Sequence, residues 1–217
     1  DNLFINTLFY ILKMKIVGLV PARKNSQGLL NKNIKLLNGK PLISYSIESA
    51  IKCKYIDTVY INSDSKEYID IGTSYGAKPF LRPFDLATDE APMKDVILNF
   101  LENLKNKNIF YDAVILLYPV YPFRTSFHLS KIIETFESRG PYSSLVGIKK
   151  PNTHPFLCYK RNNSGSIQNI MKFDEDVYYR RQNYPLYYEI THWACIVSTK
   201  SINSLNNQLI NKNTFGY

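Results

Sequence analysis

The sequence contains only three cysteines, Cys53, Cys158 and Cys195, and they stand far apart along 217 residues. A sparse, odd-numbered set without metal-ligand spacing excludes a disulfide framework and a cysteine-based zinc site, and it is typical of reduced thiols in a cytoplasmic protein. No apolar run approaches the ~20 residues that a membrane-spanning helix requires. The apolar segment 8–12 lacks the basic start of a signal peptide. We therefore expect a cytoplasmic protein with no membrane partner.

Long runs of basic residues are also missing, although the formal net charge is +9. The densest groups are pairs such as Lys149-Lys150 and Arg180-Arg181. A basic surface attracts nucleic acid, but scattered pairs do not make the continuous stripe that tracks a phosphate backbone. The positive electrostatic potential of such a surface would equally attract a triphosphate or an acidic sugar. We expect no nucleic-acid partner. The rival interpretation, that the protein binds nucleic acid, rests on the net charge alone.

Apolar runs and amphipathic segments alternate along the chain. Strands are expected at 16–20, 58–62, 113–117, 144–148 and 194–197, and helices at 42–51, 65–76, 93–104 and 129–136. Strands that alternate with helices predict the α/β class, with a doubly wound, mostly parallel sheet covered on both faces. The length suits one well-buried domain.

This alternation breaks between residues 151 and 188, where prolines, Gly165 and polar turns accumulate. We interpret the stretch as an excursion, a hairpin or an arm, from a single domain that covers residues 14–217. Met14-Lys15 resembles a natural beginning. Residues 1–13 are therefore expected to be a leader, an added remnant or a short packing arm.

The segment after the first expected strand is rich in cations and hydrogen-bonding groups. Residues 20–28 read VPARKNSQG, and KNI follows at 32–34. In open α/β sheets, ligands bind beyond the carboxyl ends of the strands. Arginine and lysine neutralise a polyphosphate, serine and backbone N–H groups add directional hydrogen bonds, and Gly28 lets the backbone approach closely. The segment matches neither the P-loop nor the dinucleotide fingerprint, and each residue alone is equally compatible with a solvated basic loop.

Taken together, ordered motifs along the chain closely resemble the acylneuraminate cytidylyltransferases, the CMP-sialic acid synthetase family. After VPARKNSQG and KNI come LNGKPLI at 37–43, NSD at 62–64, YGA at 75–77, LRP at 81–83, LATD at 86–89, LLYP at 116–119, PFR at 122–124 and RRQ at 180–182. The resemblance spans residues 15–199. It implies a Rossmann-like nucleotidyltransferase with a small dimerisation arm at 151–188, and a homodimer.

The resemblance implies roles for the loop and for one later arginine. The residues that would bind CTP are Ala22, Arg23, Ser26, Gly28, Lys32, Asn33 and Arg82, with Arg23 and Lys32 acting in catalysis. Lys32 would stabilise the negative charge that shifts toward the leaving pyrophosphate. A surface ion pair is the alternative for Arg82. For Asp64 and Asp89, the expected role is capping of the following helix.

A second set of residues would bind an acidic nine-carbon sugar by the same resemblance. It comprises Tyr118, Arg124, Arg181, Gln182, Glu189 and His192. A guanidinium grips a carboxylate through two parallel hydrogen bonds, and structural salt bridges are the alternative for both arginines. Tyr118 stands where the family usually has glutamine. For His192, the sequence favours a histidine packed beside Trp193 over a sugar contact.

The implied reaction is attack of the sugar's anomeric hydroxyl on the α-phosphorus of CTP, with loss of pyrophosphate and with help from Mg²⁺. Two segments depart from the family. Pro92-Met93 replaces its Ser-Ser, and YEITHWA at 188–194 replaces its Asn-Gly. The residues up to Tyr217 hold no Asp-Ile-Asp motif, so we assign no metal ligand. The alternatives are a cytidylyltransferase for a pseudaminic- or legionaminic-type acid, and a catalytically silent binder of CTP or an acidic sugar.

Overall fold

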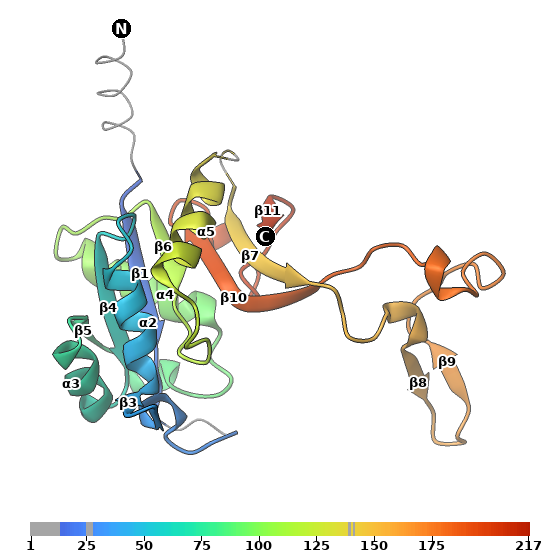
Figure 1. Ribbon diagram of the computed structural model, residues 1–217, viewed down its shortest axis with the longest axis horizontal. Helices are drawn as coiled ribbons and strands as arrows, with labels where there is room; N and C mark the ends of the chain where they lie inside the picture. The colour runs from blue at the N-terminus through green and yellow to red at the C-terminus, as the bar shows by residue number, and fades with distance from the viewer. Residues whose placement is uncertain (1–13, 25–27, 139, 141) are drawn as a thin grey trace, which may run out of the picture. The chain divides into compact units, whose positions relative to one another are not determined.

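The computed structural model describes residues 14–24, 28–138, 140 and 142–217. Residues 1–13, for which the sequence suggested a leader, a remnant or a packing arm, lie outside this range. The described chain forms a seven-stranded sheet in the order β11-β7-β10-β6-β1-β4-β5 (Figure 1). The strands are β1 (Ile16–Pro21), β4 (Thr58–Ser63), β5 (Lys78–Leu81), β6 (Ala113–Leu116), β7 (Ser144–Lys149), β10 (Glu189–Ser198) and β11 (Thr214–Gly216).

The strand directions confirm the predicted class. β1 pairs in parallel with β4 and β6, β4 with β5, and β11 with β7. Among the described strands of this sheet, β10 runs antiparallel to its neighbour β6. The amino end of β10 therefore lies at the edge where β6 ends, and this reversal adds a late segment of the chain to that edge.

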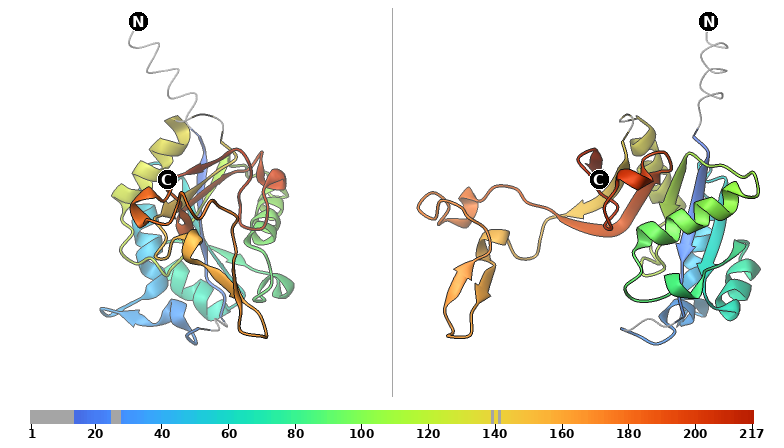
Figure 2. Two further views of the ribbon diagram at one scale, coloured as in Figure 1. Left: turned by 90° about the vertical axis from the view of Figure 1, so that its right-hand side faces the viewer. Right: turned by 180° about the vertical axis from the view of Figure 1, so that it is seen from behind.

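Helices cover both faces of the sheet (Figures 1 and 2). On one face lie α2 (Leu42–Ile51), α3 (Lys66–Ser74) and α5 (Ser126–Ser138), and on the other lies α4 (Met93–Lys105). The alternation of side chains along a strand explains this division. Ile61 of β4 belongs to the core beneath α2, whereas the neighbouring Tyr60 packs edge-on against Phe100 of α4, with ring centroids 5.1 Å apart.

The contact between α3 and β4 is particularly close. A Cβ added at Gly72 of α3 would lie 2.8 Å from side-chain atoms of Ile61, a distance that real side chains do not reach. Glycine at this position lets the helix backbone rest directly on the strand. The sheet core thus fixes α3 and its buried Tyr68.

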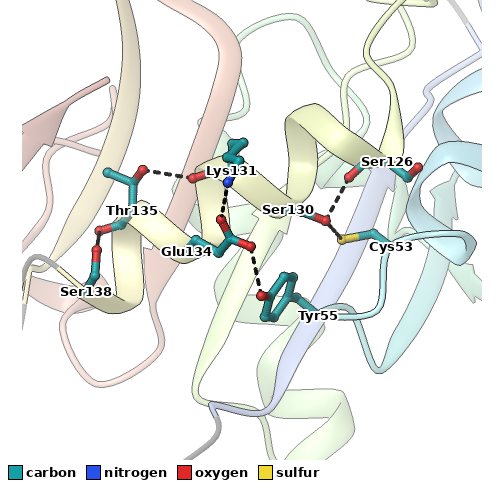
Figure 3. Close-up of polar contacts among 8 residues, drawn as sticks. All are labelled: Cys53, Tyr55, Ser126, Ser130, Lys131, Glu134, Thr135 and Ser138. Atoms are coloured by element: carbon teal, nitrogen blue, oxygen red, sulfur yellow. Dashed lines mark hydrogen bonds and ion pairs between the residues drawn. The ribbon is translucent and has the colours of Figure 1, made fainter.

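Polar contacts join α5 to the segment that follows α2 (Figure 3). The Tyr55 hydroxyl donates to Glu134 Oε1 at 2.8 Å, and Lys131 donates to Glu134 Oε2 at 2.8 Å. Lys131 and Tyr55 together lower the pKa of the Glu134 carboxyl. Cys53 Sγ lies 3.5 Å from Ser130 Oγ. This cluster involves none of the residues assigned to a site.

Residues 147–191 form a second compact unit, separate from the unit made by the rest of the described chain. It contains a hairpin of β8 (Tyr159–Arg161) and β9 (Ile167–Asn169) and the 3₁₀ turns η3 (Pro155–Leu157) and η4 (Arg181–Asn183). Phe156 is its buried centre. The Phe156 ring stacks on Phe173 at 3.9 Å between centroids, and Tyr178, Tyr184 and Tyr187 surround it.

The edge strand β5 and the start of α3 show two further local details. The sequence did not predict β5, because this edge strand reads KPFL, is mostly exposed and has no apolar run. Ser65 occupies the N-cap position of α3 but makes no side-chain capping bond, and its N–H donates to Ser63 Oγ at 3.1 Å. A separate question is whether any element could cross a membrane. No helix in the described residues is both long and apolar enough to span a bilayer.

Candidate functional site

Several of the described residues that are predicted to bind the nucleotide lie where β1, β4 and β6 end. These strands are parallel neighbours, so their carboxyl ends meet at one edge of the sheet. The reversed direction of β10 brings residues 192–193 to the same edge. Tyr118, just past β6, and His192, in β10, lie with ring centroids 5.4 Å apart.

The start of the basic loop is held by backbone and side-chain hydrogen bonds. The N–H of Ala22, which is fully buried, donates to the Asn62 carbonyl at 2.9 Å. Asn33 Nδ2 donates to the Arg23 carbonyl at 3.1 Å, and the Lys24 N–H donates to Asp64 Oδ1 at 2.9 Å. Asp64 therefore fastens the loop instead of capping α3. Ser26, a predicted CTP contact, lies outside the described residues.

The later part of the loop carries the predicted catalytic lysine. Lys32 begins the 3₁₀ turn η1 (Lys32–Ile34), with its side chain half-buried, and the adjacent Asn33 is 4% exposed. Asn31, just before them, has the left-handed backbone (φ 54°) that asparagine tolerates better than most residues. Gly28 is exposed, and a Cβ there would meet nothing within 4 Å. The loop thus has both a tightly held and an open part.

Arg23 forms an ion pair with Asp89. The expected role of Asp89 as a helix cap is wrong: α4 begins at Met93, its N-cap residue is Pro92, and that position makes no side-chain capping bond. The pair joins the phosphate loop to the LATD motif, 66 positions further along the chain. Both side chains remain partly exposed, so the pair can open when a stronger anion reaches Arg23.

Arg82 is buried, at 6% exposure, so the alternative of an ordinary surface ion pair is wrong. Its Nε donates to Asn62 Oδ1 at 2.5 Å and its Nη2 donates to the Asn62 carbonyl at 3.3 Å. Burial lowers the pKa of Arg82 to about 10, and Asp64 counteracts part of this effect. Arg82 is thus still a cation at neutral pH, at the carboxyl end of β4 and β5.

Tyr118 and His192 share a small aromatic contact at this edge. Burial raises the pKa of the Tyr118 hydroxyl above its ordinary value, so it stays a neutral donor. His192 is exposed, with its ring on Tyr118. The histidine that packs against Trp193 is instead His128, with centroids 5.3 Å apart. The alternative of a packed His192 is therefore not what the structure has.

Arg124 is the largest fully buried side chain, at 2% exposure. Its Nη1 donates to the Trp193 carbonyl at 2.7 Å, but Nε and Nη2 have no partner in the described part of the chain. No carboxylate of the described residues pairs with it, so the alternative of a structural salt bridge finds no support. Burial lowers its pKa to about 10, which leaves the guanidinium charged. A buried cation with free donors is costly unless an anion compensates it.

The other predicted sugar contacts belong to the second unit. Arg181 and Gln182 are exposed in η4, and Glu189 forms an ion pair with Lys149 at 2.6 Å. Arg181 also lines a cavity of about 450 Å³ within this unit, together with Lys150, Asn152, His154, Tyr184 and Tyr187. No acidic side chain lines this cavity. Its two cations make it suitable for an anion.

Metal ligands are sparse in the described residues, where no group of three or more His, Cys, Asp or Glu side chains could hold an ion. Asp64 and Asp89 are the carboxylates that contact the basic loop. Protein Mg²⁺ sites often use one or two carboxylates, with substrate phosphates as the remaining ligands. This donor set fits a metal that arrives with a nucleotide, and does not fit an all-protein cage.

Comparison with protein families identifies the chain. Residues 17–206 match the family model described as "Cytidylyltransferase". This chain belongs to the cytidylyltransferase family. It is 31% identical over 175 residues to CMP-N,N'-diacetyllegionaminic acid synthase of Legionella pneumophila, a match that covers 80% of this chain and 74% of that protein. The predicted family resemblance is confirmed.

Two further relatives also match this chain, and one solved structure has the same fold. N-acylneuraminate cytidylyltransferase of Escherichia coli is 36% identical, over 65% of this chain and 33% of that protein. Pseudaminic acid cytidylyltransferase of Campylobacter jejuni is 40% identical, over 57% and 53%. The chain thus spans about a third and about half of these two relatives. The fold matches CMP:2-keto-3-deoxy-manno-octonic acid synthetase complexed with CTP, with a TM-score of 0.65, 16% identity and coverage of 94% and 90%.

The sequence did not predict several contacts of the candidate site residues in either unit. Asn62 supports both Ala22 and Arg82, Asp89 pairs with Arg23, and Lys150 faces the cavity beside Arg181. Asn62 and Asp89 lie within matched motifs, which was the only available signal for them. Their pairings depend on the register between strands that are distant in the sequence. No local sequence pattern predicts that register.

Proposed function

We propose that this chain transfers CMP from CTP to the anomeric hydroxyl of a nonulosonic acid of the sialic type and releases pyrophosphate. The observation that carries the proposal is the basic loop held at the carboxyl ends of β1 and β4, with Arg23, Lys32 and Asn33 on it. The legionaminic, neuraminate and pseudaminic relatives support the substrate class.

In this reaction the anomeric oxygen bonds to the α-phosphorus of CTP, and the bond from that phosphorus to the bridging β-phosphate oxygen breaks. The electron pair leaves with pyrophosphate, and the hydroxyl proton passes to water. Arg23 and Lys32 supply positive charge where negative charge accumulates. Mg²⁺, when bound, neutralises phosphate oxygens, and Asp64 and Asp89 are the carboxylates that would hold it.

Arg82 is proposed to favour cytosine over uracil. A guanidinium only donates hydrogen bonds, and cytosine N3 accepts one, whereas uracil N3 carries a hydrogen. Asn62 fixes the Arg82 guanidinium from one side, so it cannot easily turn away from an unsuitable base. A buried donor left unpaired is costly, and this supports discrimination against UTP.

The test is pyrophosphate release with CTP, Mg²⁺ and a panel of N-acetylneuraminic, legionaminic and pseudaminic acids. Turnover with at least one of them, lost in EDTA and restored by Mg²⁺, supports the proposal. The preferred acid separates the sialic-type acceptor from the two alternatives. CTP binding without turnover on any acid would instead support a silent binder.

The cavity of the second unit is proposed to take the sugar carboxylate, through Arg181 and Lys150. We expect Arg181→Ala to raise the KM for the sugar acid about tenfold or more, because a charge-assisted, two-pronged contact is lost, and to leave the KM for CTP unchanged. Steady-state kinetics on each substrate measure both values. Arg161→Ala, an exposed arginine on β8, is the matched control and should leave both values unchanged. Equal effects of the two variants would refute the assignment.

The chain is further proposed to act as a homodimer in the cytoplasm, where CTP is available and thiols remain reduced. The second unit exposes Leu186 at 71%, Ile167 at 64% and Tyr179 at 64%. A unit this small leaves apolar surface that a second copy of the chain would cover. Light scattering on the purified protein should give twice the mass of one chain, and the mass of a single chain would contradict the dimer.

A further inference from the structure

Tyr68 is a buried tyrosine of α3 whose hydroxyl contacts only the basic loop among the printed hydrogen bonds. Its side chain is 0% exposed, and its ring belongs to the core cluster of the sheet. Because Gly72, one turn later, rests directly on β4, the ring is carried by a fixed helix. The hydroxyl therefore has a set position in space.

The hydroxyl reaches both sides of the loop. It lies 3.4 Å from the Lys24 carbonyl oxygen and 3.2 Å from Asn31 Oδ1. A tyrosine hydroxyl has one hydrogen to donate and can also accept. It can share its hydrogen between the two oxygens, or donate to Lys24 while a rotated Asn31 amide donates to it. Burial raises the pKa of Tyr68, so the hydrogen is retained at neutral pH.

The two contacted residues are next to the two proposed catalytic cations, Arg23 and Lys32. Lys24 follows Arg23, and its N–H is already held by Asp64, which comes directly before the α3 N-cap residue. Asn31, in its left-handed conformation, immediately precedes Lys32 and Asn33 in η1. A single hydroxyl thus fixes the backbone near one proposed catalytic cation and the side chain next to the other.

We propose that Tyr68 is a positioning residue that holds Lys24 and Asn31 in register with α3, so that the loop is preorganised for the CTP phosphates. This inference rests on the proposed function. Preorganisation acts on binding, because the cost of ordering the loop is removed before the ligand arrives. Tyr68 touches neither phosphate nor sugar, so its loss should weaken CTP binding more than it slows the chemical step.

The test compares Tyr68→Phe with Tyr55→Phe. Each change removes one hydroxyl and leaves the ring, and Tyr55 donates to Glu134 at 2.8 Å in the α5 cluster, which none of the assigned residues joins (Figure 3). We expect Tyr68→Phe to raise the Kd and KM for CTP about three- to tenfold, the effect of one lost hydrogen bond, with kcat changed less than twofold. Tyr55→Phe should leave all three values within twofold of the original protein.

Amide hydrogen exchange provides a readout that does not depend on activity. In the ligand-free protein, peptides covering residues 28–35 should exchange faster in Tyr68→Phe than in the original protein, and Tyr55→Phe should show no change there. Unchanged exchange and unchanged CTP affinity in Tyr68→Phe would overturn the inference, as would a fall in kcat alone. If the original protein does not bind CTP, the proposed function fails, and the exchange comparison still decides the role of Tyr68.

Discussion

Replacing Lys32 with alanine is expected to lower the rate of pyrophosphate release about 100-fold or more, while the protein remains folded. Loss of one preorganised group that stabilises transition-state charge typically has an effect of this size. Lys32 is half-buried on a 3₁₀ turn and makes no ion pair among the described residues, so its removal breaks no structural contact of that kind. Stopped-time assays of pyrophosphate at saturating CTP and sugar acid measure the effect.

Lys35→Ala is the matched control for Lys32→Ala. Lys35 ends the same 3₁₀ turn but is exposed, so its loss changes the net charge equally without removing the half-buried Lys32. We expect less than about a threefold change in rate, which is what loss of screened surface charge produces. If the two variants behave alike, the general charge of the loop matters and the assignment of Lys32 is wrong.

Replacing Arg124 with methionine is expected to separate activity from stability. The guanidinium is 2% exposed, has two unpartnered donor atoms and meets no carboxylate in the described residues. Exchanging an uncompensated buried charge for an apolar side chain of similar length is often neutral or stabilising. We therefore expect an unchanged or higher Tm, measured by calorimetry. At the same time kcat/KM should fall about 30-fold or more, because a buried cation that attracts anionic substrates to the carboxyl end of β6 is removed.

The opposite pattern would contradict this account of Arg124. If its hydrogen bond to the Trp193 carbonyl is its main purpose, the variant should lose stability and the surviving folded protein should keep its turnover. Arg124→Lys separates charge from shape: a lysine keeps the charge but not the planar fork, so it should restore little of the activity if the fork is required.

The sequence predicted the parts of this molecule that local patterns determine. Continuous apolar runs placed β1, β4 and β6, and parallel pairing then required their following loops to meet at one edge. This was enough to bring the start of the VPARKNSQG loop together with Tyr118. Arg82 follows β5, which the sequence did not predict, so only the family resemblance singled it out. The direction of β10 was not predictable from its composition, because a buried strand reads the same in either direction.

The sequence also did not predict contacts between side chains that are distant along the chain. The Tyr68 hydroxyl and the Lys24 carbonyl are 44 residues apart, and Arg82 and Asn62 are 20 residues apart. Each pairing depends on strand register and on the close approach of α3 to β4. Arg124 was singled out by resemblance, but its complete burial and unpaired donors emerged only from the packing around it.

Calorimetric titration of the purified chain with CTP, and separately with UTP, tests the central claim most directly. The account predicts saturable CTP binding at one site per chain in the presence of Mg²⁺. It also predicts binding of UTP at least about tenfold weaker, because Arg82 and Asn62 present donors that suit cytosine. Absence of CTP binding, or equal affinity for CTP and UTP, would contradict a cytidine nucleotide site at the carboxyl ends of β1 and β4.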